Sequence, residues 1–334
     1  MDQQFVLPAG MSLDLSVEAV GPVEPVPDNY AFVINVSSLV DATSFSLAPG
    51  HELRRAKSEE ASKIREILEY QTPGPNDEVK VAPWEHKRTG DVVEHLPEAE
   101  WRYHVIGFRG SNFTVEDLRH VLDLAPLELK IGFVVMYHVG PGESLHEART
   151  LHPGRLFQLL EDADRARLAF LDVKASDVEE IKGIHTQFQQ HDPHGDVKLL
   201  ARQLHDVETL PSSSPLRFLG YFAILESLLT HPPKPSDPYD SITRQVKKKI
   251  ALLDHRFLHH IDYSPFSCTN AETVWGKMYA YRSLLAHGGT PSFDGELNIL
   301  GNHDNALKLV KQTVKATIRQ SLSEPQLLVD LRDC

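Results

Sequence analysis

An arginine and a histidine lie five residues apart near the end of the chain, where residues 279–289 read Tyr-Ala-Tyr-Arg-Ser-Leu-Leu-Ala-His-Gly-Gly. Arginine holds phosphate groups well through its planar guanidinium group, and histidine exchanges protons near neutral pH. On a helix, Arg282 and His287 are roughly 7.5 Å apart along the axis and about 140° apart around it. Cleavage of RNA by its own 2′-hydroxyl needs a group that moves protons and a cation that holds the phosphate. The pair fits that reaction.

The residues after this pair predict the end of its helix. Gly288 and Gly289 supply the left-handed conformation that stops a helix, so His287 is expected at the last turn. There the negative end of the helix dipole favours the protonated imidazole. The spacing alone fits equally well an exposed arginine and a helix-end histidine with no catalytic role. The neighbouring helices therefore have to decide between the two interpretations.

Three predicted helices surround the pair along the chain. Residues 271–287 carry apolar side chains at helical spacing, and residues 304–321 repeat that pattern after the pair. Upstream, residues 215–230 are almost wholly apolar and contain one carboxylate, Glu226. Pro-rich breaks at residues 211–215 and 232–235 separate these helices from what precedes them.

This ordered set resembles the HEPN family of helical ribonuclease domains, most of all its Apea type. A helix with a lone glutamate, a basic helix, a Tyr-x-x-Arg-Ser-x-x-x-His-Gly segment and a closing helix follow one another over roughly residues 210–325, about a third of the chain. The resemblance implies a helical bundle that dimerises and cuts RNA without a metal, leaving a 2′,3′-cyclic phosphate. It also implies a role in anti-phage defence or as a toxin, with tRNA among the targets.

Within that resemblance, Arg282 and His287 are the expected catalytic residues, and three others are expected to support them. A buried carboxylate needs a partner, and an arginine can donate two parallel hydrogen bonds to it, so Glu226 is expected to orient Arg282. An exposed position for Glu226 on the bundle surface is equally compatible with the sequence. Ser283 either lines the same cleft or faces solvent. Tyr279 belongs to the core or its rim, where it could stack on a base.

Acidic residues outnumber basic residues in this chain by 47 to 34, which gives a formal net charge of −13. Affinity for a polyanion comes from basic surfaces, so this charge argues against a passive nucleic-acid coat but leaves room for a local basic cleft. The densest basic stretch falls in the proposed nuclease region. Its expected RNA-binding residues are Arg244, Lys247, Lys248 and Lys249.

The sequence predicts neither a metal nor a cofactor. Histidines 185, 191 and 194 gather near two aspartates, but Pro193 and Gly195 indicate a solvated loop, and 18 histidines in the chain make such clusters common. His255 and His259 have the spacing of zinc ligands on a helix, without the glutamate of a His-Glu-x-x-His motif. No phosphate-binding glycine loop is present, which removes support for kinase, NTPase and dinucleotide-dependent functions.

The whole chain of 334 residues has room for two cores. Alternating apolar segments at 31–36, 102–108 and 131–139, with helices at 58–70 and 114–122, predict an α+β domain over residues 1–150. A helical connector over 151–209 and an all-α, HEPN-like ribonuclease domain over 210–334 follow. Residues 71–100 are expected to form a surface excursion, and residues 13–19 a further strand.

The partners follow from the same observations. RNA is the expected substrate, and a second copy is expected to bind through the C-terminal bundle. The N-terminal domain is expected to control when or what the enzyme cuts, in response to a phage-derived trigger or an inhibitory partner. With no apolar run of 18 residues, no export signal and only two cysteines, Cys268 and Cys334, we expect a cytoplasmic protein. The rival hypothesis is a non-catalytic HEPN-type module that binds or dimerises, and a weaker third is a metal hydrolase using the histidine loop.

Overall fold

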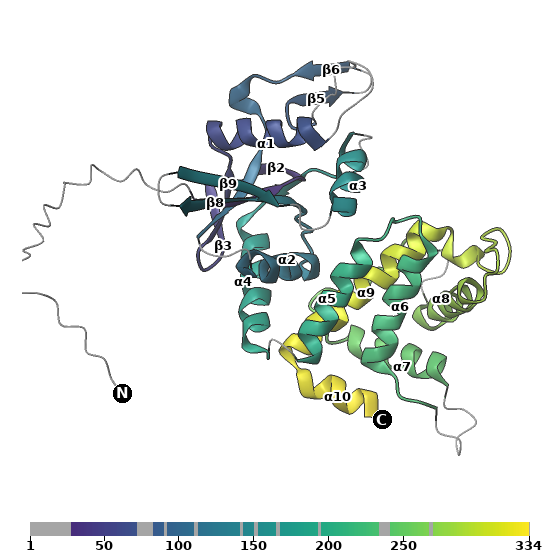
Figure 1. The fold of residues 1–334 in the computed structure, drawn as a ribbon. Helices are drawn as coiled ribbons and strands as arrows, with labels where there is room; N and C mark the ends of the chain where they lie inside the picture. Colours follow the sequence, from purple (N-terminus) through teal and green to yellow (C-terminus); the bar gives the residue numbers. More distant parts are fainter. Residues whose placement is uncertain are drawn as a thin grey trace, which may run out of the picture.

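The protein folds into a sheet-containing N-terminal part and a mostly helical C-terminal part, as seen in a computed structural model (Figure 1). The structure describes residues 28–71, 83–89, 92–109, 113–140, 143–149, 153–164, 168–192, 195–233, 241–266 and 270–333. The predicted order of an α+β part followed by helices is confirmed at this level. The predicted strand at 13–19 lies outside the described residues. Within them, no helix is both long and apolar enough to cross a membrane.

Six strands of the described chain form one antiparallel sheet in the order β3-β4-β7-β1-β8-β9. The central strand β1 pairs on one side with β7, where Ala31 lies opposite Ile106, and on the other with β8, where Ala31 lies opposite Val134. Its β-branched and aromatic residues suit a pleated surface that is covered on both sides. The strands are β1 (Asn29–Val33), β3 (Ser44–Ala48), β4 (His51–Arg55), β7 (His104–Phe108), β8 (Ile131–Gly140) and β9 (Glu143–Arg149).

The two faces of this sheet bury separate apolar clusters because successive side chains point in opposite directions. Tyr30 and Phe32 belong to the cluster on the side of α1 and α3, whereas Ala31 and Val33 belong to the cluster on the side of α2 and α4. Figure 1 shows α2 and α4 between the sheet and the bundle. The helices are α1 (Ser58–Gln71), α2 (Phe113–Leu124), α3 (Pro153–Asp164) and α4 (Ala175–Gln190).

Smaller elements surround the main sheet. The predicted surface excursion at 71–100 is exposed over residues 92–95 and 97–100, but Trp84 ties it to the core: its side chain is buried and its Nε1–H donates to the Ile34 carbonyl at 2.7 Å. An aromatic residue brings enough apolar area to anchor such a polar segment on the core. The elements are β2 (Val36–Leu39) parallel to β10 (Leu171–Val173), the hairpin of β5 (His86–Thr89) and β6 (Val92–His95), and the 3₁₀ turn η1 (Glu98–Glu100). A second 3₁₀ turn, η2 (Asn298–Leu300), packs in the C-terminal part.

The C-terminal part packs its helices around α6 and α9. Helices α6, α8 and α9 begin and end within two residues of the ranges predicted from apolar spacing, but the short last helix was not predicted. Its nine residues are too few for the spacing of apolar side chains to indicate a helix. The bundle consists of α5 (Asp196–Glu208), α6 (Pro215–Leu229), α7 (Ile242–Asp254), α8 (Ala271–Ala286), α9 (His303–Ser323) and α10 (Pro325–Asp333).

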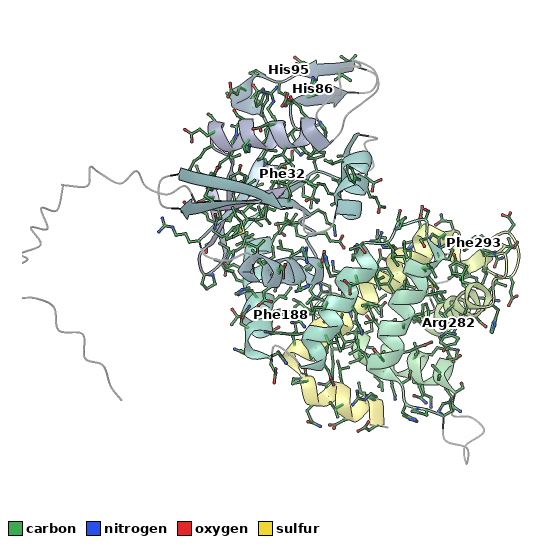
Figure 2. The ribbon with its side chains drawn as sticks, viewed as in Figure 1. Phe32, His86, His95, Phe188, Arg282 and Phe293 are labelled. Atoms are coloured by element: carbon green, nitrogen blue, oxygen red, sulfur yellow. The ribbon has the colours of Figure 1, made fainter. Side chains whose placement is uncertain are left out.

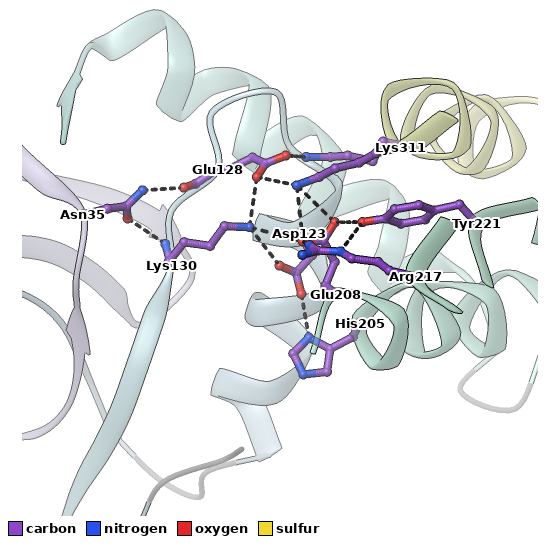
Figure 3. Close-up of polar contacts among 10 residues, drawn as sticks. Asn35, Asp123, Glu128, Lys130, His205, Glu208, Arg217, Tyr221 and Lys311 are labelled. Carbon is purple, nitrogen blue, oxygen red and sulfur yellow. Dashed lines mark hydrogen bonds and ion pairs between the residues drawn. The ribbon is translucent and has the colours of Figure 1, made fainter. Parts of the chain in front are cut away.

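The sheet part and the bundle share one continuous apolar cluster, which runs from one sheet face through α2 and α4 into α5, α6 and α9. A group of buried charges crosses the same boundary, and we call it the junction network (Figure 3). The division at residues 150 and 210 therefore remains a prediction, since the two parts bury apolar surface against each other. The junction network consists of Asp123, Glu128, Lys130, His205, Glu208, Arg217, Tyr221, Lys311 and Lys315.

The junction network keeps its buried charges ionised by pairing them several times. Burial opposes ionisation of Glu128, but the ammonium groups of Lys130, Lys315 and Lys311 together hold its pKa well below the usual range. Burial also opposes ionisation of Glu208, and its neighbouring cations lower its pKa to about 2. Burial of Lys315 lowers its pKa to about 8 even though Glu128 lies 2.8 Å away. Desolvated charges of this kind persist only when each has close partners.

Candidate active site in the helical bundle

Helix α8 ends one residue before His287, where the two glycines predict a stop. Gly288 has a φ of 72°, in the left-handed region that glycine adopts without strain. Its N–H donates to the Leu285 carbonyl at 3.1 Å, and the N–H of Gly289 donates to the Leu284 carbonyl at 2.9 Å. These two bonds form a Schellman motif, which satisfies the last carbonyl groups of the helix. His287 is therefore fixed as the C-cap residue of α8.

Arg282 lies on α8 and contacts α6, on the side of the bundle remote from the sheet (Figure 2). Its Nη2 donates to Glu226 Oε2 at 3.1 Å, so the predicted contact between these residues is present. The predicted pair of parallel bonds is not, because Glu226 Oε1 accepts instead from the Tyr279 hydroxyl at 2.8 Å. The Arg282 guanidinium also lies 5.8 Å from the centre of the Tyr279 ring. Glu226 thus joins both side chains.

The Tyr279 hydroxyl stays protonated and donates its hydrogen bond to Glu226. Burial, and then the hydrogen bond to Glu226, raise the pKa of Tyr279 far above its usual value. Phe222 of α6 packs edge-on against its ring, with 5.9 Å between ring centres. Tyr279 is therefore a positioning group at the rim of the core, and its ring is held by α6 and by Arg282.

One N–H donor of the Arg282 guanidinium has no hydrogen-bond acceptor among the described residues. This donor is Nε, which is buried, while the side chain as a whole is half-buried. A buried donor without an acceptor costs about 1–3 kcal/mol, so such groups in folded proteins call for an explanation such as binding or catalysis. A further acceptor, such as an anionic ligand, would satisfy this group.

His287 is exposed, and its imidazole makes no hydrogen bond to any described residue. Its backbone N–H donates to the Ser283 carbonyl at 3.1 Å, which continues the helical pattern by one residue. Because α8 is helical through Ala286, the angular separation of about 140° between Arg282 and His287 applies. Ser283 is half-buried and lies one turn before His287, about 40° away around the axis. Ser283 is thus nearer to the histidine's side of the helix than to the arginine's.

The four predicted RNA-binding residues of α7 do not share one environment. Arg244 and Lys248 are exposed, and Lys247 lies beside Glu272 of α8 at 3.3 Å. Lys249 is buried, and its Nζ lies 3.4 Å from the carbonyl oxygen of Arg332 in α10. This position does not favour contact between Lys249 and a ligand in solvent. The helical period separates it from its neighbours, because adjacent residues are about 100° apart around a helix.

The histidines expected in one loop lie in different places. His185 lies within α4, where burial lowers its pKa, and His191 is the C-cap of that helix, where its Nε2 hydrogen-bonds to the Leu322 carbonyl oxygen at 3.0 Å. His194 lies outside the described residues. His255 is the C-cap of α7, so His259 falls beyond that helix, where its Nε2 lies 3.1 Å from Glu180. Within the described ranges, no group of three or more His, Cys, Asp or Glu residues is arranged to hold a metal ion.

Two further features of α8 were not predicted. Lys277 lies on its exposed side near Glu296, at 3.9 Å, and contributes a cation next to the basic residues of α7. Tyr281 is buried, and its hydroxyl lies 2.7 Å from Nδ1 of His303. The position of Lys277 on the side of α8 that carries Ala280 could have been predicted from the spacing of three residues between them. The contact with His303 joins residues 22 positions apart, and no local pattern indicates it.

Comparison with known proteins assigns the chain to no family. No model of a known protein family matches the chain, and neither the curated proteins nor the solved structures contain a significant match.

Proposed function

We propose that the protein is a metal-independent endoribonuclease of the Apea-like HEPN type. The observation that carries this proposal is the Arg282 guanidinium, which is held by Glu226 and keeps a buried Nε–H without an acceptor among the described residues, five positions before an exposed helix-end histidine. A phosphate would bind the solvent-exposed part of this guanidinium, whose side chain is 32% exposed. Charge that develops on a phosphate during reaction is stabilised best by donors already oriented toward it.

In this reaction His287 moves the protons. It accepts the proton of the attacking 2′-hydroxyl, the 2′-oxygen bonds to phosphorus, and the bond to the 5′-oxygen breaks as that oxygen gains a proton. Arg282 holds the phosphate oxygens, and Glu226 and Tyr279 hold Arg282. The products are a 2′,3′-cyclic phosphate and a 5′-hydroxyl. DNA lacks the nucleophile and is not cut.

A second copy of the chain completes this proposal. Arg282 and His287 of one helix point in directions about 140° apart, which is too wide to enclose a single phosphate. A homodimer with two-fold symmetry through the bundle would place both kinds of group from both copies around one cleft. The sheet part would then respond to a phage-derived trigger or an inhibitory partner during anti-phage defence. Cellular RNA, including tRNA, would be the target.

The same wide angle favours a second candidate function. A HEPN-type module that dimerises or binds without catalysis would need Arg282 only for its contact with Glu226, and His287 only as a helix cap. In that case purified protein would leave RNA intact under all conditions.

One assay separates the candidates. Purified protein is incubated with total RNA, with and without EDTA, and the cleavage ends are mapped. We expect cleavage that survives EDTA and leaves cyclic phosphate ends. Substitution His287→Ala should lower the rate by roughly 10²–10⁴-fold, the usual scale for loss of a general acid–base, and Arg282→Ala should lower it comparably. A folded variant of either kind that cuts at the wild-type rate would reject the assignment.

A further inference from the structure

A hollow follows the outer side of α7 and α8 on the bundle. One section, with a volume of about 610 Å³, is lined by Ser241, Thr243, Arg244, Lys247, Lys248, Ala251 and Glu272. The adjoining section, of about 330 Å³, is lined by Lys247, Glu272, Thr273, Gly276, Lys277, Ala280 and Glu296. Because Lys247 and Glu272 line both sections, they form one channel, which we call the α7–α8 groove.

The α7–α8 groove carries positive charge on an acidic protein. Four cations line it, namely Arg244, Lys247, Lys248 and Lys277, against two carboxylates, Glu272 and Glu296, so its formal charge is 4 − 2 = +2 while the chain carries −13. Both carboxylates are exposed. Surface pairs such as Lys247 with Glu272 contribute about 1 kcal/mol or less, so a phosphate group competes with them readily.

The face of α8 that lines the groove at Gly276 and Ala280 continues along the helix to His287. Gly276, Ala280, Ser283 and His287 are spaced by four, three and four residues, which places them on one face of α8. From Gly276 to His287 this face extends about 16 Å along the helix axis. A β-carbon built on Gly276 meets only Lys247 Nζ, at 3.8 Å, so the helix backbone is open to a ligand there.

We propose that the α7–α8 groove binds a single strand of RNA on one side of the cleavage point and delivers the scissile phosphate to His287. This inference rests on the proposed function and adds a path for the substrate. The cations hold phosphates a few nucleotides away from the bond that breaks. A strand fits better than a duplex because the groove is lined by two adjacent helices and is open at the surface. The smooth floor at Gly276 and Ala280 admits a sugar or base.

The test measures binding apart from cleavage. A His287→Ala protein is titrated with a short fluorescein-labelled single-stranded RNA, taken from a mapped cleavage site or, where the wild-type protein cuts no RNA, of mixed sequence. The titration is repeated at several salt concentrations. Groove variants are made in this background: Lys247→Gln with Lys277→Gln to remove charge, and Gly276→Leu to fill the floor. Matched controls on α4 are Lys182→Gln, which removes another lysine paired with a nearby glutamate, and Gly183→Leu, where an added β-carbon also meets no close neighbour.

We expect Gly276→Leu to weaken binding at least tenfold. The lysine double variant should reduce the slope of log affinity against log salt by roughly 0.7 for each phosphate that the protein no longer neutralises. The controls should bind as the parent does. A neutral methylphosphonate linkage walked along the strand should weaken binding most a few nucleotides from the cleavage point, and that effect should vanish in the lysine double variant.

The outcomes separate the two ideas. If the wild-type protein cuts RNA but the groove variants bind like the controls, the groove inference is wrong and the proposed function stands. If the groove variants lose binding but the wild-type protein never cuts, the groove stands and catalysis fails. Duplex RNA that binds as tightly as the single strand, or no binding of RNA to the parent, overturns the inference.

Discussion

Two glutamates in the bundle have nearly the same partners but very different surroundings. Glu208 accepts hydrogen bonds from Arg217 at 2.8 Å and from Tyr221 at 2.6 Å. Glu226 accepts them from Arg282 at 3.1 Å and from Tyr279 at 2.8 Å. In the junction network Lys311 also approaches Glu208, at 3.1 Å (Figure 3). A cluster of glutamate, arginine and tyrosine is therefore not by itself the mark of an active site.

Burial accounts for the difference. The Glu208 side chain is 3% exposed and Arg217 11%, against 18% for Glu226 and 32% for Arg282. Charges removed from water persist only with full pairing, and the junction network supplies it with additional lysines. Near the surface a single carboxylate is enough to hold an arginine. An arginine held in this way remains partly open to a further anion, which a fully paired one is not.

The largest expected effect comes from removing Glu208, the buried carboxylate that Arg217 and Tyr221 contact in the junction network. Glu208→Ala should lower the free energy of unfolding by about 3–5 kcal/mol, because it leaves buried cations without their carboxylate. Glu226→Ala is the matched change in the partly exposed cluster of Glu226, Arg282 and Tyr279, and it should lower the free energy of unfolding by about 1 kcal/mol or less. Urea denaturation of both variants at neutral pH measures the two values. Equal losses would mean that Glu208 and Glu226 both have a structural role, and that burial does not distinguish them.

A second prediction concerns pH at the boundary between the two parts. Burial lowers the pKa of His120 from 6.5 to about 4, and its ring lies 5.6 Å from that of His205 in the junction network. His120 is therefore neutral in the folded protein, and unfolding takes up a proton between these pH values. The free energy of unfolding should fall as the pH drops through this window, by about 3 kcal/mol for a shift of this size.

The variant His120→Leu isolates this effect, since its side chain does not titrate. Urea denaturation at pH 7 and at pH 4 should show a smaller loss of stability for the variant than for the wild-type protein. His104, whose pKa burial also lowers to about 4, contributes the same dependence in both proteins and so cancels in the comparison. Parallel losses in the two proteins would show that His120 does not contribute.

The smallest expected effect tests whether Glu226 positions Arg282 for catalysis. Glu226→Gln keeps an acceptor for Tyr279 but removes the charge that holds Arg282, so we expect about a tenfold loss of kcat for RNA cleavage with little change in KM. One factor of ten corresponds to about 1.4 kcal/mol, the scale of one charged hydrogen bond. Tyr279→Phe should lose less, because Arg282 keeps its carboxylate. A Glu226→Gln variant with full activity would reduce Glu226 to a structural residue.

The apolar spacing of the chain was sufficient to locate most helices, since burial of one helix face needs only local periodicity. In α8 the spacing of Val274, Met278 and Tyr281 predicted the buried face, and Gly288 predicted the end. The edge region of the sheet was harder to predict. Strands β3 and β4 have five residues each, which is too short for alternation alone to identify them. Their pairing with each other, the pairing of β4 with β7 and the packing of α4 on β3 make them strands.

For the candidate site, the sequence by itself determined which residue types lie near one another along α8, because the order Tyr279, Arg282, His287 and the helical period fix their relative directions. It also supplied Glu226 as the one carboxylate in an apolar helix. Only the tertiary structure decided that Glu226 divides its two oxygens between Arg282 and Tyr279, that Lys249 is buried, and that α7 and α8 line a groove. These features depend on the way α6, α7 and α8 cross. Crossing is set by side-chain packing between residues far apart in sequence, which no local pattern records.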